Sequence, residues 1–183
     1  MRRLLLLRHA KSDWPPGIAD EHRPLAPRGR RAAPKLGAYL ADEALRPDRV
    51  LVSPALRARQ TWELVAAAWA QPPESAVDAR LYEHPAQTLL EAVRATGPQV
   101  RSLLLVSHNP TLEDFVHLMV GIWPDQARRH FTAKFPTAGL AVIELPVDDW
   151  SQAAPGTGRL DRFVTPALLG AATPGAAPQG PAA

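Results

Sequence analysis

Three short runs of apolar residues stand out along the chain, and polar residues do not interrupt them. They lie at residues 4–7, 50–52 and 103–106. Continuous apolar runs of this length are typical of strands that are covered on both faces, as in a parallel sheet. A polar turn follows each run, and then a segment with helical spacing of its apolar residues. This alternation predicts an α/β fold, a single-domain three-layer sandwich with a mainly parallel central sheet flanked by helices.

Helical spacing and proline positions locate the predicted helices. They cover residues 28–45, 54–69, 85–95 and 110–120. Pro54 suits the first turn of the second helix, because the missing N–H of proline is no loss there. Pro34 must lie in the first turn of the first helix or kink that helix.

Further strands are predicted at residues 76–81 and 140–145, with an edge strand at 159–164. The pattern of residues 125–136 is weaker and indicates a short helix and a loop. The last fourteen residues, 170–183, contain six Ala, three Gly and three Pro and no charged residue. Because such a composition buries little apolar surface, we expect one domain over residues 1–169 and a disordered tail behind it.

Composition and charge exclude several classes of protein. The 183 residues are 46% hydrophobic, which suits one globular domain, and the absence of cysteine excludes disulfides and a thiol nucleophile. The net charge is +3, from 21 cations and 18 anions, and the cations are scattered near acids rather than clustered as in nucleic-acid-binding proteins. No apolar run has the length of a signal peptide or of a membrane span. We therefore expect a cytoplasmic protein without nucleic-acid or membrane partners.

Polar side chains follow the three apolar runs, at the edge of the sheet where ligands bind in open α/β folds. Arg8 and His9 follow the first run, Arg57 lies one helical turn beyond the second, and His108 and Asn109 follow the third. If the three strands are neighbours, two imidazoles and two guanidiniums converge on one crevice.

That combination of side chains suits a phosphoryl group. The guanidinium is a planar fork of donors that matches phosphate oxygens, and helix starts after the strands add backbone N–H groups. An unprotonated histidine can attack phosphorus, and a second histidine can donate to a phosphoryl oxygen, so this chemistry needs no metal or other cofactor. Taken singly, each residue also has an ordinary interpretation. His108 would cap a helix, and Arg57 would pair with Glu63 or Glu43.

Motifs at the same positions resemble those of the histidine phosphatase superfamily. Residues 7–12 (LRHAKS) resemble the Arg-His-Gly signature, and residues 53–61 (SPALRARQT) are similar to the Ser-Pro-x-x-Arg-Ala-x-Gln-Thr element. Residues 107–110 (SHNP) resemble the motif of the second histidine in its SixA-like form, found in the phosphohistidine phosphatase branch. The resemblance runs over about residues 3–121 and implies a phosphoglycerate mutase-like fold.

The resemblance also implies roles for the residues that match the motifs. His9 is the implied nucleophile that becomes phosphorylated, and Arg8 and Arg57 are the implied phosphate clamp. His108 is the implied second histidine on the phosphoryl oxygens. Asn109, beside it, is a candidate for substrate binding.

Two further candidates are less firmly placed. Ser12 matches a position that is often near the phosphate, although a turn hydroxyl is an equally good interpretation. Glu83 is the nearest candidate for the general acid that many superfamily members use, and its alternative is an exposed turn carboxylate. SixA-like members resemble this chain in having no secure acid there. Phosphohistidine tolerates that, because its leaving imidazole has a pKa of about 6.5, far below that of an alkoxide.

The predicted function is that of a metal-independent phosphohydrolase that works through a phosphohistidine enzyme intermediate on a phosphorylated protein. Two alternatives are a phosphatase of small phosphate esters with Glu83 as acid and a non-catalytic phosphate-binding module. A metallohydrolase with His9 and His108 as ligands would place Arg8 and Arg57 beside its cation. Trp14, at the tip of the loop over residues 11–27, is expected to cap the core rather than to contact a partner. The oligomeric state is not predicted.

Overall fold

A single seven-stranded sheet forms the centre of the computed structural model, which describes residues 1–131 and 135–171. Its strands are β1 (Arg2–Arg8), β2 (Arg49–Val52), β3 (Glu74–Val77), β4 (Ser102–Ser107), β5 (Val120–Ile122), β6 (Leu140–Leu145) and β7 (Gly158–Val164). The order across the sheet is β3-β2-β4-β1-β6-β7-β5. The first four strands in that order are parallel, whereas β6 runs antiparallel to both β1 and β7. The prediction of a mainly parallel sheet is therefore confirmed.

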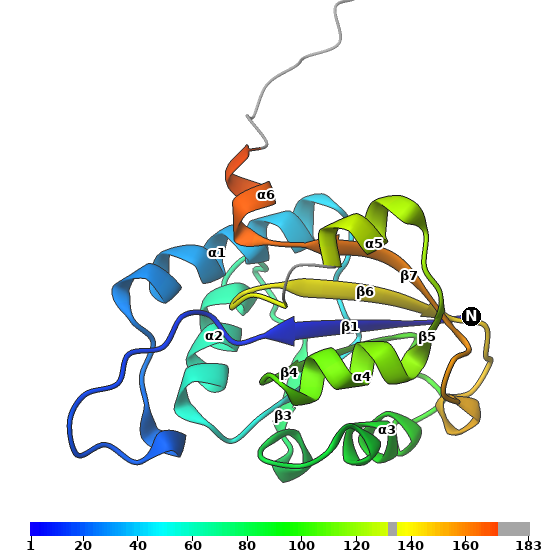
Figure 1. Cartoon of the computed structure of the whole chain (residues 1–183), viewed down its shortest axis with the longest axis horizontal. Helices are drawn as coiled ribbons and strands as arrows, with labels where there is room; N and C mark the ends of the chain where they lie inside the picture. Colours follow the sequence, from blue (N-terminus) through cyan, green and yellow to red (C-terminus); the bar gives the residue numbers. More distant parts are fainter. Residues whose placement is uncertain (132–134, 172–183) are drawn as a thin grey trace, which may run out of the picture.

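Helices cover both faces of the sheet, which gives the three predicted layers (Figure 1). The α-helices are α1 (Pro27–Asp42), α2 (Leu56–Ala66), α3 (Ala86–Arg94), α4 (Thr111–Met119), α5 (Asp125–Phe131) and α6 (Pro166–Ala171). Short 3-10 helices occur at η1 (Asp20–His22), η2 (Ala79–Leu81) and η3 (Trp150–Gln152). The helices α1 and α2 pack on one face, and α3, α4 and α5 pack on the other. Among the described residues, no helix is long and apolar enough to cross a membrane.

The apolar run in β1 shows why this strand does not alternate. Leu4 and Leu6 pack with α3 and α4, whereas Leu5 and Leu7 pack with α1 and α2. All four side chains are fully buried. A strand between two layers of helices has no solvent face, so every position along it is apolar.

Several element boundaries differ from the prediction. The strand predicted at residues 76–81 ends at Val77, because the Asp78 side chain accepts a hydrogen bond from the Arg80 N–H and starts η2. The strand predicted at residues 159–164 exists as β7, but it is not at the edge, since β5 pairs with its outer side. The short strand β5 directly follows α4 and was not predicted.

The positions of two prolines and the last helix also differ from the prediction. Pro27 takes the first turn of α1, so Pro34 lies in the interior of that helix and not in its first turn. Pro54 precedes α2, which begins at Leu56. Gly170 and Ala171, the first residues of the predicted tail, belong to α6. Residues 172–183 lie outside the described residues, so a tail there stays a prediction.

Candidate active site

The ends of β1, β2 and β4 bring the predicted site residues together. Leu7 on β1 and Val52 on β2 both pair with Val106 on β4, so the three strands end side by side. A cavity of about 440 Å³ opens at this edge of the sheet. Its lining includes all seven predicted site residues, namely Arg8, His9, Ser12, Arg57, Glu83, His108 and Asn109.

His9 is held as a neutral ring with one free nitrogen. Its Nδ1 lies 2.8 Å from the carbonyl oxygen of Ala10, and because a carbonyl only accepts, Nδ1 must carry the proton. Burial, and then the charge of His108, lowers the pKa of His9 to about 3, although the hydrogen bond to Ala10 opposes the shift. At neutral pH the Nε2 atom therefore has an unprotonated lone pair, as a nucleophile requires.

The second histidine lies beside the first. The ring centroids of His108 and His9 are 5.0 Å apart. His108 Nε2 is 2.6 Å from Ser53 Oγ, and that oxygen already accepts the N–H of Ala55. The Ser53 hydroxyl can donate to Nε2, and in that tautomer of His108 the ring proton is on Nδ1. This Nδ1 is buried and has no hydrogen-bond partner among the described residues.

The two arginines line the cavity, and each has a guanidinium N–H group that no described residue accepts. Arg8 donates from Nη1 to the carbonyl oxygen of Phe135 at 2.7 Å. Arg57 donates from Nη1 to the backbone oxygen of Asp20 at 2.6 Å and from Nη2 to its carboxylate at 2.9 Å. The Nε atoms of both arginines are buried and unpartnered within the described part of the chain. Leaving a buried donor unpaired costs about 1–3 kcal/mol, and an oxyanion is the ligand class that pairs such donors together.

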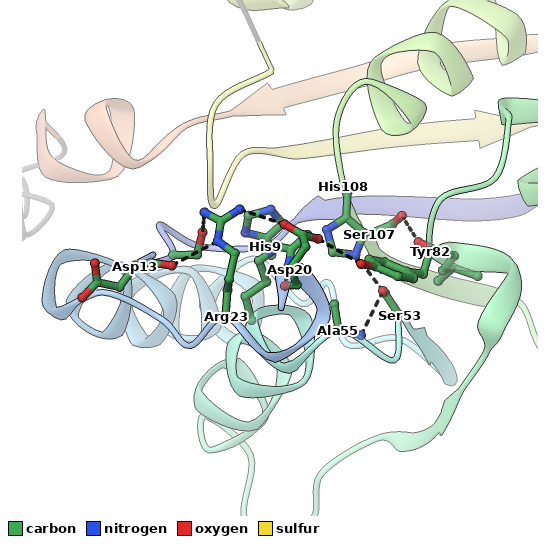
Figure 2. A network of polar contacts seen from close by, with 12 residues as sticks. His9, Asp13, Asp20, Arg23, Ser53, Ala55, Tyr82, Ser107 and His108 are labelled. Carbon is green, nitrogen blue, oxygen red and sulfur yellow. Dashed lines mark hydrogen bonds and ion pairs between the residues drawn. The ribbon is translucent and has the colours of Figure 1, made fainter. Parts of the chain in front are cut away.

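Asp20 was missed by sequence reasoning, although it lies at the centre of the polar network in Figure 2. Its carboxylate accepts hydrogen bonds from Arg57, Arg23 and Tyr82. Burial acts to raise the pKa of Asp20, but these hydrogen bonds outweigh it and lower the pKa to about 2. Burial, and then the hydrogen bond to Asp20, raises the pKa of Tyr82 to about 12. The carboxylate is therefore ionised and Tyr82 is neutral at physiological pH.

No strand end or motif points to Asp20, because it lies on η1 in the long loop between β1 and α1. The available signal was its spacing, three residues before Arg23, which suits an ion pair on one helical turn. Tyr82, which precedes Glu83 in the sequence, had no predicted role at the site. The hydroxyl of Ser107 holds the turn that carries both residues by donating to the Leu81 carbonyl oxygen.

Ser12 and Asn109 line the cavity, but their hydrogen bonds join them to other protein groups. Ser12 Oγ accepts from Arg23 at 2.8 Å. The Asn109 amide donates to Glu113 and to the carbonyl oxygen of Phe135. Their roles in substrate binding therefore stay predictions.

Glu83 also lines the cavity, and its side chain is exposed to solvent. The residue adopts a left-handed conformation, with φ of 55°, at the turn between η2 and α3. It makes no hydrogen bond or ion pair with another described residue. Its role as a general acid therefore stays a prediction.

The expectation for Trp14 was wrong. The side chain is 65% exposed, and the guanidinium of Arg23 lies 3.9 Å from its ring centroid. An isolated bridge between Ser12 and Leu25 closes the base of the loop that carries Trp14. The ring gains a cation–π contact there instead of burial.

The buried neutral histidines predict a pH-dependent stability. In the unfolded chain His9 and His108 titrate near pH 6.5, whereas in the folded protein their pKa values are about 3. Between these values the unfolded state binds more protons, so the free energy of unfolding must fall as pH falls below 6.5. We expect a loss on the order of 2 kcal/mol per histidine at pH 4.5 relative to pH 7.

Urea unfolding of the wild type and of His108→Gln at the two pH values measures this loss. The variant lacks one titrating ring, so its stability should depend less on pH. Asp20 does not interfere, because its stabilising effect is lost only as pH falls below about 4, toward its folded pKa of about 2. An identical pH dependence in the two proteins would contradict the assignment of a neutral His108.

Comparison with known proteins places the chain in a family. The sequence profile of the histidine phosphatase superfamily (branch 1) matches residues 4–86. An uncharacterized protein of Mycobacterium tuberculosis is 38% identical over 162 residues, which cover 87% of this chain and 99% of that protein. The chain belongs to the histidine phosphatase superfamily, whose members are generally phosphohydrolases.

Solved structures agree with this assignment and with the phosphoglycerate mutase-like fold. A SixA-type protein of Agrobacterium tumefaciens is 33% identical, with a TM-score of 0.74, over 90% of this chain and 98% of that one. The protein histidine phosphatase SixA complexed with tungstate is 26% identical, with a TM-score of 0.73, over 91% of this chain and 99% of that one.

Proposed function

We propose that the protein is a phosphohistidine phosphatase that transfers the phosphoryl group of a phosphorylated protein to His9 and then to water. The observation that carries the proposal is the neutral His9, whose Nε2 is free, beside unpaired donors on Arg8, Arg57 and His108. A nucleophile and preorganised donors at one cavity are the two requirements of covalent phosphoryl transfer.

The residues suggest two successive displacements at phosphorus. In the first, the phosphohistidine ring of the substrate carries a proton from solvent on its other nitrogen. His9 Nε2 attacks the phosphorus atom, the P–N bond of the substrate breaks, and its electron pair passes to the leaving nitrogen, so that the ring departs as neutral imidazole. In the second, water attacks the phosphoryl group on His9, the new P–N bond breaks, and a proton of the water passes to solvent. Arg8, Arg57 and the His108 Nδ1–H would stabilise the charge on the phosphoryl oxygens in both steps.

Two observations support an oxyanion at this site and a nitrogen leaving group. One similar structure is that of a protein histidine phosphatase complexed with tungstate, which is an oxyanion like phosphate. The exposed Glu83 makes no hydrogen bond or ion pair with another described residue, and an imidazole, unlike an alkoxide, needs little help from a general acid to leave.

Intact-protein mass spectrometry tests the proposal. Wild-type protein mixed with a phosphoramidate donor and quenched without acid should gain the mass of one phosphoryl group, or should release inorganic phosphate if the intermediate hydrolyses quickly. Binding of phosphate or vanadate with neither adduct nor turnover would instead support a non-catalytic phosphate-binding module.

Glu83→Gln separates a phosphohistidine phosphatase from a phosphatase of small esters. If Glu83 protonates an alkoxide, the variant should lose about 10²-fold or more in turnover of alkyl phosphate esters. Turnover of phosphoramidate should change little, because its leaving nitrogen needs no such acid. We expect little effect on phosphoramidate and slow ester hydrolysis in the wild type. Rapid ester hydrolysis that is lost in the variant would favour the small-ester function.

A further inference from the structure

A second cavity adjoins the catalytic cavity at Thr137, which lines both. It has a volume of about 400 Å³ and lies between the start of α1, the start of α6 and the segment before β6. We call it the side groove. Its lining includes Arg28, His130, Pro136, Thr137, Pro166 and Leu168.

The side groove does not end at α6. His130 and Leu168 also line a larger depression of about 1100 Å³ between α1 and β7. The three cavities therefore follow one another over the surface, each sharing a lining residue with the next. A small phosphate compound would fill only the first cavity, whereas a polypeptide carrying a phosphohistidine must leave the cavity along some such path.

The lining of the side groove combines apolar surface with positive charge. Pro136, Pro166 and Leu168 provide apolar surface, and Leu168 is 38% exposed. Arg28 and His130 are its basic residues, and no carboxylate is among the described residues that line it. The groove thus complements a ligand that carries both apolar and acidic side chains.

The positive charge of Arg28 is not balanced by the residues around it in α1. Arg28 is in the first turn of α1, where the helix dipole disfavours positive charge, and that turn contains no acidic residue. Its exposed guanidinium makes no hydrogen bond or ion pair with another described residue. An acidic group from outside the chain would pair this charge.

We infer that the side groove binds the polypeptide next to the phosphohistidine of a protein substrate, with an apolar side chain on Leu168 and an acidic side chain against Arg28. This inference rests on the proposed function. Because an extended chain advances about 3.3 Å per residue, a few residues suffice to pass from one cavity into the adjoining one across Thr137. Trp14, the exposed aromatic residue on the neighbouring loop, is less suited to this role because Arg23 already covers its ring.

Two synthetic phosphohistidine peptides test the inference on the full chain. One carries leucine and glutamate within four residues on either side of the phosphohistidine, and the other carries serine and lysine at the same places. The wild type should have a kcat/KM about tenfold higher for the first peptide. The preference should weaken at high salt, because screening reduces the attraction between exposed charges.

Two variants locate the effect in the side groove. Arg28→Glu and Leu168→Asp should each lower kcat/KM for the leucine–glutamate peptide about fivefold or more, mainly by raising KM. Turnover of phosphoramidate, which has no flanking residues, should stay within twofold of the wild type. Arg30→Glu is the matched control, because Arg30 is exposed on the same helix but does not line the groove. It should retain the preference.

The outcomes separate this inference from the proposed function. Equal kcat/KM for the two peptides, or equal losses in Arg28→Glu and Arg30→Glu, would overturn the inference. Turnover of phosphoramidate without turnover of either peptide would also overturn it, while leaving a phosphohydrolase. If the wild type turns over neither peptide nor phosphoramidate, the proposed function itself fails, and the inference falls with it.

Discussion

His9→Ala is expected to abolish turnover of phosphoramidate and phosphohistidine substrates, with a loss on the order of 10⁴-fold or more, as when a covalent nucleophile is removed. The physical reason is that no other group at the cavity combines an unprotonated nitrogen with access to the phosphoryl site. His108 Nε2 is already engaged by Ser53. Phosphate release measured under saturating substrate checks the loss, and the same variant should gain no phosphoryl mass.

The control for this variant is His22→Ala. His22 lies on η1 in the loop that borders the site and is exposed, but it does not line the catalytic cavity. It should keep wild-type turnover. Turnover by His9→Ala equal to that of His22→Ala would sink the assignment of the nucleophile, provided that circular dichroism shows both variants folded.

Arg57→Ala should lose about 10²–10³-fold in kcat for phosphoramidate, the range found for removing one preorganised donor to a transition-state oxyanion. Arg57 is almost fully buried, and Asp20 fixes its guanidinium through two hydrogen bonds. Its donors therefore need no reorganisation when charge develops on the phosphoryl group. Steady-state kinetics measure the loss, with each rate corrected for the fraction of the variant that is folded.

Arg59→Ala is the matched control, because Arg59 lies on the same helix and is exposed. It should change kcat less than twofold. Arg57→Lys retains a charge but loses the planar fork, so we expect it to recover only part of the activity. Full activity in Arg57→Ala would show that this guanidinium does not contact the reacting phosphoryl group.

The part of the fold that the sequence predicts is the part with a clear apolar pattern. The run in β1 is continuous because both faces of the strand are buried, and the helices α1 to α4 leave a periodic signal because one face is buried and the other is exposed. By contrast, β5 and α6 are too short to leave a periodic pattern, and β7 becomes an internal strand only because β5 pairs with it. The pairing joins segments that are far apart in the sequence, so no local pattern of residues predicts it.

The residues of the site likewise fall into those that the sequence predicts and one that it does not. Arg8, His9, Arg57 and His108 follow strands or begin helices, so the topology of an α/β sheet predicts where they meet. Asp20 reaches the site on a loop that folds back over the strand ends, and nothing within that loop's sequence specifies the return.

The hydrogen bonds between Asp20 and Arg57 also affect the release of the product at the end of the catalytic cycle. Under the proposed function, the product is inorganic phosphate, whose negative charge would lie near the ionised Asp20 carboxylate. Repulsion between the two anions would weaken the hold of the cavity on free phosphate, while Arg57 stays oriented for the next substrate. Because the Asp20 carboxylate partly neutralises the charge of Arg57, the site would release phosphate rapidly and would be little inhibited by it.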